Sequence, residues 1–260
     1  MTPDDAQVPS KAMELGVSIM KRIFVAIVLG VSISSASAAT VNISPSKDAT
    51  IFSSGGVNGL GDLFSGSNGG LAPPDERRVL TAFDLSGIPF GVTIDNVSLT
   101  FTILRSQGTV TGSLHRLLQD WAEGDQAGMG TNGGQPSAPA GGNDVTWTVT
   151  GMGSNWTSPG ADFVGPASDS AAIPAFGTVT FTSAGMAADV QGWVDGSFSN
   201  FGWLLTGSVT QQNVRKLASG EAVSGQPQLS VTYSVVPVPA TALLFGSALA
   251  LLGLRRRKAA

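Results

Sequence analysis

Val97-Ser-Leu-Thr-Phe-Thr-Ile103 places an apolar side chain at every second position, with serine or threonine between them. Alternation with a period of two is typical of a β-strand that has one dry face and one wet face. The same pattern recurs in residues 145–149, 178–182 and 229–235. These four stretches therefore predict strands that bury one face.

Segments rich in Gly, Ser, Asn and Pro separate the predicted strands, and we expect them to be surface loops. They are residues 53–61, 128–142 and 154–160. One short helix is predicted at residues 186–194, because its larger apolar residues fall on one face. Those residues are Met186, Val190, Trp193 and Val194. Many short strands, long loops and a single helix predict an all-β fold, an antiparallel jelly-roll β-sandwich.

The N-terminal part of the chain has the three-part pattern of a secretory signal peptide. Two basic residues precede an apolar stretch, and a small-residue segment ends in Ala36-Ser37-Ala38. We predict a signal helix at residues 20–38, read by the Sec translocon and cleaved after this segment, so that Ala39 becomes the N-terminus. Residues 1–19 contain acids where a signal peptide has none, so we interpret them as a wrongly assigned extension before a true start at Met20. The alternative is an N-terminal strand or helix of the core.

Three segments with different physical properties adjoin at residues 236–258. An extended Pro motif is followed by the uncharged apolar run 241–254 and by a basic cluster. The motif is Val236, Pro237, Val238, Pro239 and Ala240, and the basic cluster is Arg255, Arg256, Arg257 and Lys258. As a transmembrane helix, the apolar run would span about 21 Å, less than the roughly 30 Å hydrocarbon core. It predicts a marginal, temporary anchor with its basic end in the cytoplasm; the alternative is a plain C-terminal membrane tail.

This C-terminal segment resembles the PEP-CTERM sorting signal of Gram-negative bacteria, in the variant that reads Val-Pro-x-Pro-Ala. Val238 stands where the form that names the family has glutamate, which leaves the identity of the processing enzyme open. The resemblance implies export, transient retention in the inner membrane and cleavage by an exosortase-type enzyme. It also implies delivery to the cell surface or to an extracellular matrix such as that of a biofilm.

Residues 39–235, which remain when both end segments are removed, are enough for one domain of β-sandwich size. They carry 7 basic and 15 acidic residues, a net charge of −8, which argues against nucleic acid as a partner. The chain has no cysteine and a single histidine, His115. Disulfides and thiol chemistry are therefore excluded, and a histidine-rich metal site or a Ser-His-Asp triad is disfavoured. We assign His115 a structural role in a strand.

Several short motifs run through this body. They are Asp48-Ala-Thr-Ile51, the stretch 83–89, Gln119-Asp-Trp-Ala-Glu-Gly124 and the stretch 228–233. In this order they resemble the DNRLRE-domain proteins, a bacterial jelly-roll family akin to carbohydrate-binding modules. Gly220 departs from the pattern, since relatives often have arginine there, and a role of that arginine does not carry over. The resemblance implies a jelly-roll domain at residues 39–235 that binds carbohydrate.

Three acids are candidates for a metal site. Asp120, Glu123 and Asp125 lie close together in the chain, and neighbouring carboxylates can share a Ca²⁺, which takes about six to eight oxygen ligands. A solvated acidic turn is the alternative. No cofactor is required by any motif, so Ca²⁺ would be structural.

Two of the five tryptophans are candidates for ligand binding, because an exposed indole can stack on a sugar ring. Trp156 lies in a polar segment rich in Gly and Ser, and we expect it to be exposed; Trp121 is the second candidate. Trp147, Trp193 and Trp203 occur in apolar patterns and are predicted to be buried.

These features predict an exported, non-catalytic protein of the cell surface or exopolysaccharide matrix that binds polysaccharide. The first alternative is a structural or adhesive matrix protein that self-assembles, because uncovered sheet edges can pair between copies. The second is a polysaccharide hydrolase or lyase. Hydrolysis needs two facing carboxylates, but no recognisable catalytic motif is present. Lyases use tyrosine and histidine side chains, and the chain has only one of each, Tyr233 and His115. A lyase function is therefore disfavoured.

Overall fold

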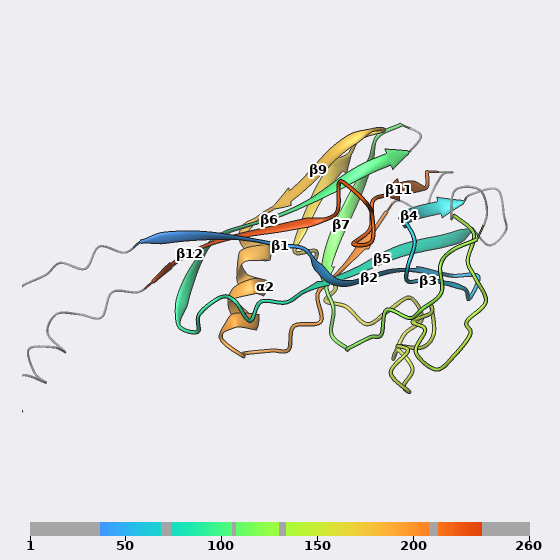
Figure 1. Cartoon of the computed structure of the whole chain (residues 1–260), viewed down its shortest axis with the longest axis horizontal. Helices are drawn as coiled ribbons and strands as arrows, with labels where there is room; N and C mark the ends of the chain where they lie inside the picture. The colour runs from blue at the N-terminus through green and yellow to red at the C-terminus, as the bar shows by residue number, and fades with distance from the viewer. Residues whose placement is uncertain (1–36, 69–73, 106–107, 130–133, 208–212, 236–260) are drawn as a thin grey trace, which may run out of the picture. The chain divides into compact units, whose positions relative to one another are not determined.

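The described residues form two antiparallel sheets, which share one strand, and one helix (Figure 1). The computed structural model describes residues 37–68, 74–105, 108–129, 134–207 and 213–235. Within these ranges the strands are β1 (Ala38–Ile43), β2 (Pro45–Phe52), β3 (Val57–Asn58), β4 (Leu63–Asn68), β5 (Asp75–Phe83), β6 (Val92–Arg105), β7 (Val110–Arg116), β8 (Asp169–Ile173), β9 (Gly177–Thr182), β10 (Trp203–Thr206), β11 (Arg215–Leu217) and β12 (Gln228–Val235), and the helix is α2 (Ala184–Val194). The prediction of an all-β sandwich with one short helix is confirmed for this part of the chain.

One strand joins the two sheets. The first sheet contains β1, β12, β6, β9 and β11, and the second contains β2, β3, β5, β10, β7 and β8. The first half of β4 pairs with β11 and its second half pairs with β5. Gly66, where the partner changes, has a φ of 111°, which residues with a side chain rarely adopt. Gly66 therefore allows β4 to pass from one sheet to the other.

The main core lies between the sheets. Alternate residues of β6, such as Leu99 and Phe101, are fully buried there together with Val79 of β5 and Trp203 of β10. The helix α2 packs over β6 and adds Met186 and other apolar residues to the same cluster. This burial is the main source of stability in a chain without disulfides.

A second core lies on the outer face of the second sheet. The connection between β7 and β8, residues 117–168, which we call the loop layer, runs across this face (Figure 1). Its Trp121 and Trp156 pack against Ile51 of β2, Leu80 of β5 and Leu204 of β10. The loop layer thus acts as a third layer built without long strands.

Three of the four predicted strands are confirmed. Residues 97–103 lie in β6, 178–182 in β9 and 229–235 in β12. The predicted helix is also confirmed and begins two residues earlier, at Ala184. The hydroxyl of Ser183 accepts a hydrogen bond from the Met186 N–H at 3.1 Å, which caps the helix.

The predicted strand at residues 145–149 is wrong, because this segment folds on itself within the loop layer. The Thr146 hydroxyl accepts hydrogen bonds from the backbone N–H groups of Thr148 and Val149, both at 3.2 Å. Such local bonds offer the backbone an alternative to a sheet ladder. Val145 is fully buried against the second core, whereas Thr148 is exposed. The alternating apolar residues therefore belong to a folded turn and not to a strand.

Two of the predicted surface loops are also partly wrong. Residues 53–61 include β3, and both Val57 and Asn58 are buried. Residues 154–160 have no strand, but Trp156 is buried within them. In both places the loop layer or the sheet beneath it covers the chain, so a Gly- and Ser-rich composition does not make these segments solvent-exposed.

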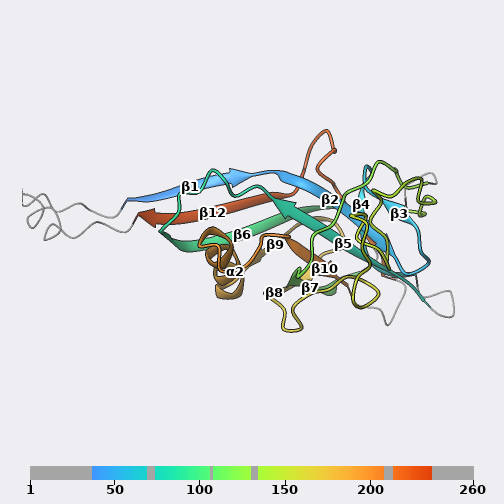
Figure 2. The same ribbon diagram turned by 90° about the horizontal axis from the view of Figure 1, so that it is seen from below.

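The first and last described strands lie side by side. β1 pairs with β12 from Ala38 opposite Ser234 to Ile43 opposite Leu229. The start of β1 and the end of β12 therefore lie at the same end of the sandwich, while the loop layer lies toward the other end (Figure 1, Figure 2).

Most of the predicted targeting segments lie outside the described residues. This holds for the signal peptide up to Ala36, the motif 236–240, the apolar run and the basic cluster 255–258. Of the predicted signal cleavage site, Ala38 and Ala39 are the first two residues of β1. Among the described residues, no helix is both long and apolar enough to cross a membrane.

Candidate functional site

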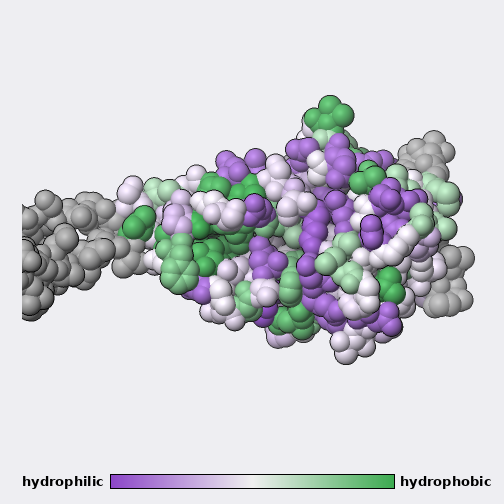
Figure 3. Space-filling model, turned by 60° about the horizontal axis from the view of Figure 1, so that its bottom comes forward, coloured by the Kyte–Doolittle hydropathy of each residue, from purple (hydrophilic) through white to green (hydrophobic). Residues whose placement is uncertain are grey.

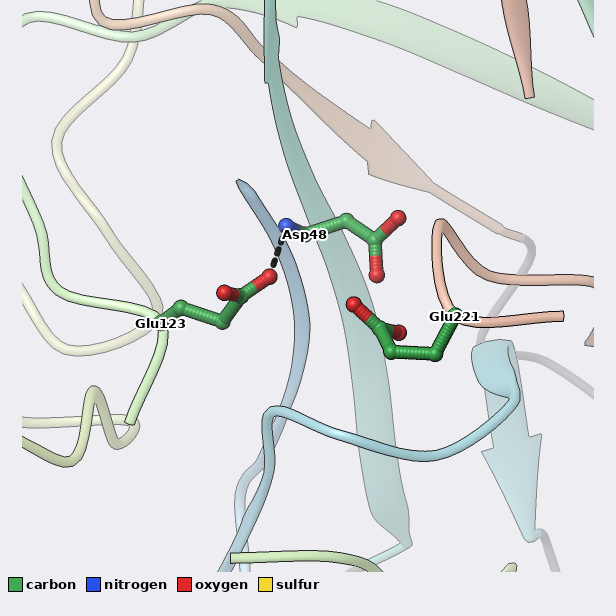
Figure 4. A group of neighbouring side chains, drawn as sticks. All are labelled: Asp48, Glu123 and Glu221. Atoms are coloured by element: carbon green, nitrogen blue, oxygen red, sulfur yellow. Dashed lines mark hydrogen bonds between the residues drawn. The ribbon is translucent and has the colours of Figure 1, made fainter. Parts of the chain in front are cut away.

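Three carboxylates from distant parts of the chain meet beside the second sheet. Asp48 lies on β2, Glu123 in the loop layer and Glu221 in the connection between β11 and β12. One oxygen from each lies within 4.8 Å of the others (Figure 4). We call these three residues the acid cluster.

Asp48 is the buried member of the acid cluster. Its side chain is fully buried, and its Oδ2 accepts a hydrogen bond of 2.7 Å from the Gly220 N–H. Its Oδ1 is also buried and has no hydrogen-bond partner among the described residues. A buried polar atom without a partner costs free energy in most proteins, so this oxygen marks an unsatisfied position in the fold.

Backbone contacts bring the other two acids to Asp48. The Asp48 N–H donates to Glu123 Oε1 at 2.6 Å, and Gly220, which bonds Asp48, directly precedes Glu221. Gly59 permits the close approach of the loop layer, because a Cβ at this position would collide with the carbonyl oxygen of Glu123. Main-chain hydrogen bonds therefore hold the carboxylates of Asp48 and Glu123, and the bond from Gly220 brings Glu221 next to them.

The electrostatics of the acid cluster favour a neutral Asp48 in the protein alone. Burial first, and then the charges of Glu221 and Glu123, raise the pKa of Asp48 to about 8, although the hydrogen bond from Gly220 acts in the other direction. The pKa of Glu123 is also raised, chiefly by desolvation, although the Asp48 N–H and Lys47 act in the other direction. Negative charge is thus poorly compensated at this position.

Lys47, the cation that acts on the pKa of Glu123, is bonded to groups outside the acid cluster. Its Nζ donates to Asp120 Oδ1 at 2.7 Å and to the carbonyl oxygen of Trp121. It also lies 4.5 Å from the centre of the Trp121 ring. Asp120 is therefore an ion-pair partner of Lys47.

The metal ligands predicted from sequence are only partly brought together. Of Asp120, Glu123 and Asp125, Glu123 alone belongs to the acid cluster. Asp125 is exposed, and its carboxylate accepts a hydrogen bond of 2.6 Å from the Gln126 side chain. Closeness in the chain did not predict closeness in space, because the loop layer turns these side chains in different directions.

Asp48 and Glu221 are the members of the acid cluster that sequence reasoning missed. Asp48 and Gly220, which bring them together, are 172 residues apart. The available signal was an acid at the start of a run of buried residues, since Asp48 precedes Ala49, Thr50 and Ile51 on β2. A charged residue in such a run needs a partner that the local sequence does not supply.

The tryptophan predicted to be exposed is buried. Trp156 is only 5% exposed, and its Nε1 donates to the Thr146 carbonyl at 2.9 Å. Trp121 is fully buried, and its Nε1 donates to the Phe201 carbonyl at 3.0 Å. The expectation for Trp156 is therefore wrong, and neither ring face is open for stacking on a sugar. Both indoles instead anchor the loop layer on the second sheet.

The other three tryptophans mostly follow the prediction. Trp193 and Trp203 are buried in the main core, with ring centres 4.5 Å apart. Trp147 is only half-buried, and the Arg78 guanidinium lies 4.6 Å from its ring centre. The predicted burial is thus wrong for Trp147 because it belongs to the turn described above.

His115 takes the structural role predicted for it. It lies on β7, its Nδ1 is 3.0 Å from the carbonyl oxygen of Val164, and its ring packs edge-on against Phe163. These contacts hold the end of the loop layer against the second sheet.

Two clefts open in the loop layer. The first has a volume of about 690 Å³ and is lined by Leu118, Gln119, Thr157, Ser158, Ala161, Asp162, Phe163 and Gly165. The second, of about 510 Å³, is lined by Gly55, Pro139, Gly141, Gly142, Asp144, Thr146, Thr148, Val149, Gly151, Gly153, Ser154 and Asn155. Both linings combine hydroxyl and amide side chains with apolar groups. The molecular surface at this end is mostly hydrophilic, with scattered apolar residues (Figure 3).

Each cleft has a single carboxylate among its lining residues, and that carboxylate is occupied by backbone bonds. Asp162 accepts from the N–H groups of Thr157 and Ser158 at 2.7 and 3.0 Å. Asp144 accepts from Ala140 at 2.8 Å and from Gly141 at 3.3 Å. Both acids therefore shape their loops.

No family profile matches this sequence, and no curated protein matches it significantly.

Proposed function

We propose that this chain is an exported, non-catalytic protein of the cell surface or exopolysaccharide matrix of a Gram-negative bacterium. We further propose that its sandwich is a jelly roll whose loop layer binds polysaccharide. The observation that carries the binding proposal is the first cleft, which we call the 690 Å³ cleft, with its hydroxyl, amide and aromatic lining.

The chemistry of the 690 Å³ cleft suits sugar hydroxyls. Gln119, Thr157 and Ser158 offer neutral donors and acceptors, and half-buried Phe163 offers an apolar ring beside them. Specific pockets commonly combine an apolar wall with a few placed polar groups. An open cleft of this kind fits one or two units of a long polymer.

Export rests on the sequence of the two ends. The signal peptide and the sorting motif imply passage through the Sec translocon, temporary residence in the inner membrane and release by an exosortase-type enzyme. The sandwich is compatible with this route, because the start of β1 and the end of β12, the described residues next to the two proposed processing positions, lie side by side.

Binding is tested with the full-length chain, purified in mild detergent, and the exopolysaccharide of its own host. Ser158→Trp places a large side chain on an exposed lining residue of the 690 Å³ cleft, and we expect it to weaken binding at least tenfold. Ser199→Trp is the matched control, since Ser199 is exposed and does not line the cleft. Retention of full binding by Ser158→Trp would contradict the proposed site.

A second candidate is self-assembly into a matrix. β1 pairs with β12 on one side and with no other described strand, so its second edge is open to another copy. Concentration-dependent oligomers that disappear on proline substitution of Thr40 would favour this function over polymer binding.

A further inference from the structure

We infer that Asp48, Glu123 and Glu221 bind a divalent cation, Ca²⁺ in preference to Mg²⁺, which ties β2 to the loop layer and to the connection before β12. This inference is independent of the proposed polysaccharide binding. It replaces the ligand set expected from the sequence with one that the fold assembles.

Two observations point to a cation at this position. The first is the acid cluster itself, with three carboxylate oxygens within 4.8 Å of one another. The second is Asp48, a fully buried side chain whose Oδ1 has no hydrogen-bond partner among the described residues. Figure 4 shows the Asp48 carboxylate directed toward that of Glu221, while Glu123 contacts the Asp48 main chain. The unsatisfied oxygen and the neighbouring negative charges are both explained by one bound cation.

None of the ion pairs formed by the described residues includes a member of the acid cluster. Lys47 acts on the pKa of Glu123, but its Nζ is bonded to Asp120 and to the Trp121 carbonyl. Like charges at this separation repel, and the repulsion grows with burial. A divalent ion would offset two of the three negative charges of the carboxylates, whose oxygens already lie within 4.8 Å of one another.

The donor set favours Ca²⁺. Calcium takes about six to eight oxygen ligands in pliable geometry, whereas Mg²⁺ requires a tight octahedron and gives up its water reluctantly. Three carboxylates supply up to six oxygens from three separate segments, and the exposed side of Glu221 admits water. Ligands on loops adjust to the larger ion more readily than to the smaller one.

Calorimetric titration of the full-length chain in mild detergent with CaCl₂, after removal of metals with EDTA, tests the site. We expect one saturable site with a Kd of about 0.1–1 mM, as in other extracellular calcium modules, and weaker binding of MgCl₂. Glu221→Gln removes one charge at an exposed position, so we expect at least tenfold weaker Ca²⁺ binding. Asp48→Asn should abolish saturable binding.

Asp125→Asn is the matched control, because Asp125 is an exposed acid of the same loop outside the acid cluster. It should bind Ca²⁺ like the unmodified chain. Hydrogen exchange adds a local readout: Ca²⁺ should slow exchange in residues 118–125 and 218–222 of the unmodified chain but not of Glu221→Gln.

Three results would overturn the inference. They are the absence of saturable Ca²⁺ binding up to about 10 mM, well above the range of such modules, unchanged binding by Glu221→Gln, or binding of Mg²⁺ as tight as that of Ca²⁺. Because Glu221 is exposed, its variant decides the question even if Asp48→Asn does not fold.

Discussion

Asp48 is a buried carboxyl group on a strand, and its burial makes the stability of the protein depend on pH. Its pKa in the fold is about 8, compared with an ordinary value of 3.8. The folded chain therefore keeps a proton that the unfolded chain releases between these values. Stabilisation by this proton is complete below about pH 4 and is lost as pH rises toward 8. Glu123, whose pKa is also raised, acts in the same direction.

We expect the cation-free protein to be less stable at pH 8 than at pH 5. Asp48→Asn should remove most of this difference, because an amide does not titrate and so carries no buried charge at pH 8. Urea unfolding in EDTA at the two pH values measures it, with Asp125→Asn as the control that should keep the dependence. The charged groups that face Asp48 are Glu123, Glu221 and, beyond Glu123, Lys47. Equal pH dependence in Asp48→Asn and the unmodified chain would show that another group is responsible.

At the scale of single elements, the side chain of Gln191 forms two hydrogen bonds that link α2 to β6. Gln191 Oε1 accepts from the Ile94 N–H at 2.8 Å, and its Nε2 donates to the Val92 carbonyl at 3.0 Å. Both contacts fall near the bulge where the pairing of β6 with β12 shifts register. The glutamine amide thus replaces a missing strand partner with a matched donor and acceptor.

We expect Gln191→Ala to lower the free energy of unfolding by about 1–3 kcal/mol, because two backbone groups lose their partners. Gln228→Ala serves as the control, since Gln228 is an exposed residue at the start of β12. Chemical denaturation of both variants gives the comparison. A loss in Gln191→Ala no greater than in Gln228→Ala would mean that water replaces the amide without cost.

Elements with local signals were predictable from the sequence, and elements defined by distant partners were not. The strand at 97–103 and the helix at 186–194 need only their own periodicity, which apolar packing in the main core preserves. Residues 145–149 show the same alternation and Trp156 lies in a polar stretch, but both belong to the loop layer, where Val145 and Trp156 pack in the second core. Whether these residues form a strand or become buried depends on their contacts with the outer face of the second sheet. No local sequence pattern describes those contacts.

The acid cluster illustrates the same limit at a site. Glu123 was found because three acids lie within a few residues of one another in the sequence. Its true neighbours, Asp48 and Glu221, reach it through the pairing of β2 in the second sheet and the turn at Gly220. Only the tertiary fold brings these segments together. The sequence therefore predicts that acidic residues form a site, but not which acids belong to it.

At the scale of the whole molecule, the pairing of β1 with β12 bears on the proposed processing at both ends. The proposed cleavage after Ala38 would remove only the first pair, Ala38 with Ser234, and would leave Ala39–Ile43 in place. Removal of the tail beyond Val235 leaves β12 intact. The processed product should therefore keep the complete sandwich.

Mass spectrometry of the protein recovered from cells tests this route. We expect an N-terminus at Ala39 and a C-terminus within or shortly after the motif 236–240 in the wild-type host. A host without its exosortase should keep the whole tail. An intact Arg-Arg-Arg-Lys segment in the wild-type product would instead indicate a permanent membrane tail.

The adjacent ends of β1 and β12 also determine how the domain responds to mechanical force. When these two ends are pulled apart, the load falls first on the pair of Ala38 with Ser234 and then on each successive pair, so the bonds break one at a time. A load between Val235 and the loop layer runs along β12 instead. The hydrogen bonds from β12 to β1 and β6 lie across that direction and bear the load together. The domain is thus easily unzipped from its two ends but resists drag between its tail and its loops.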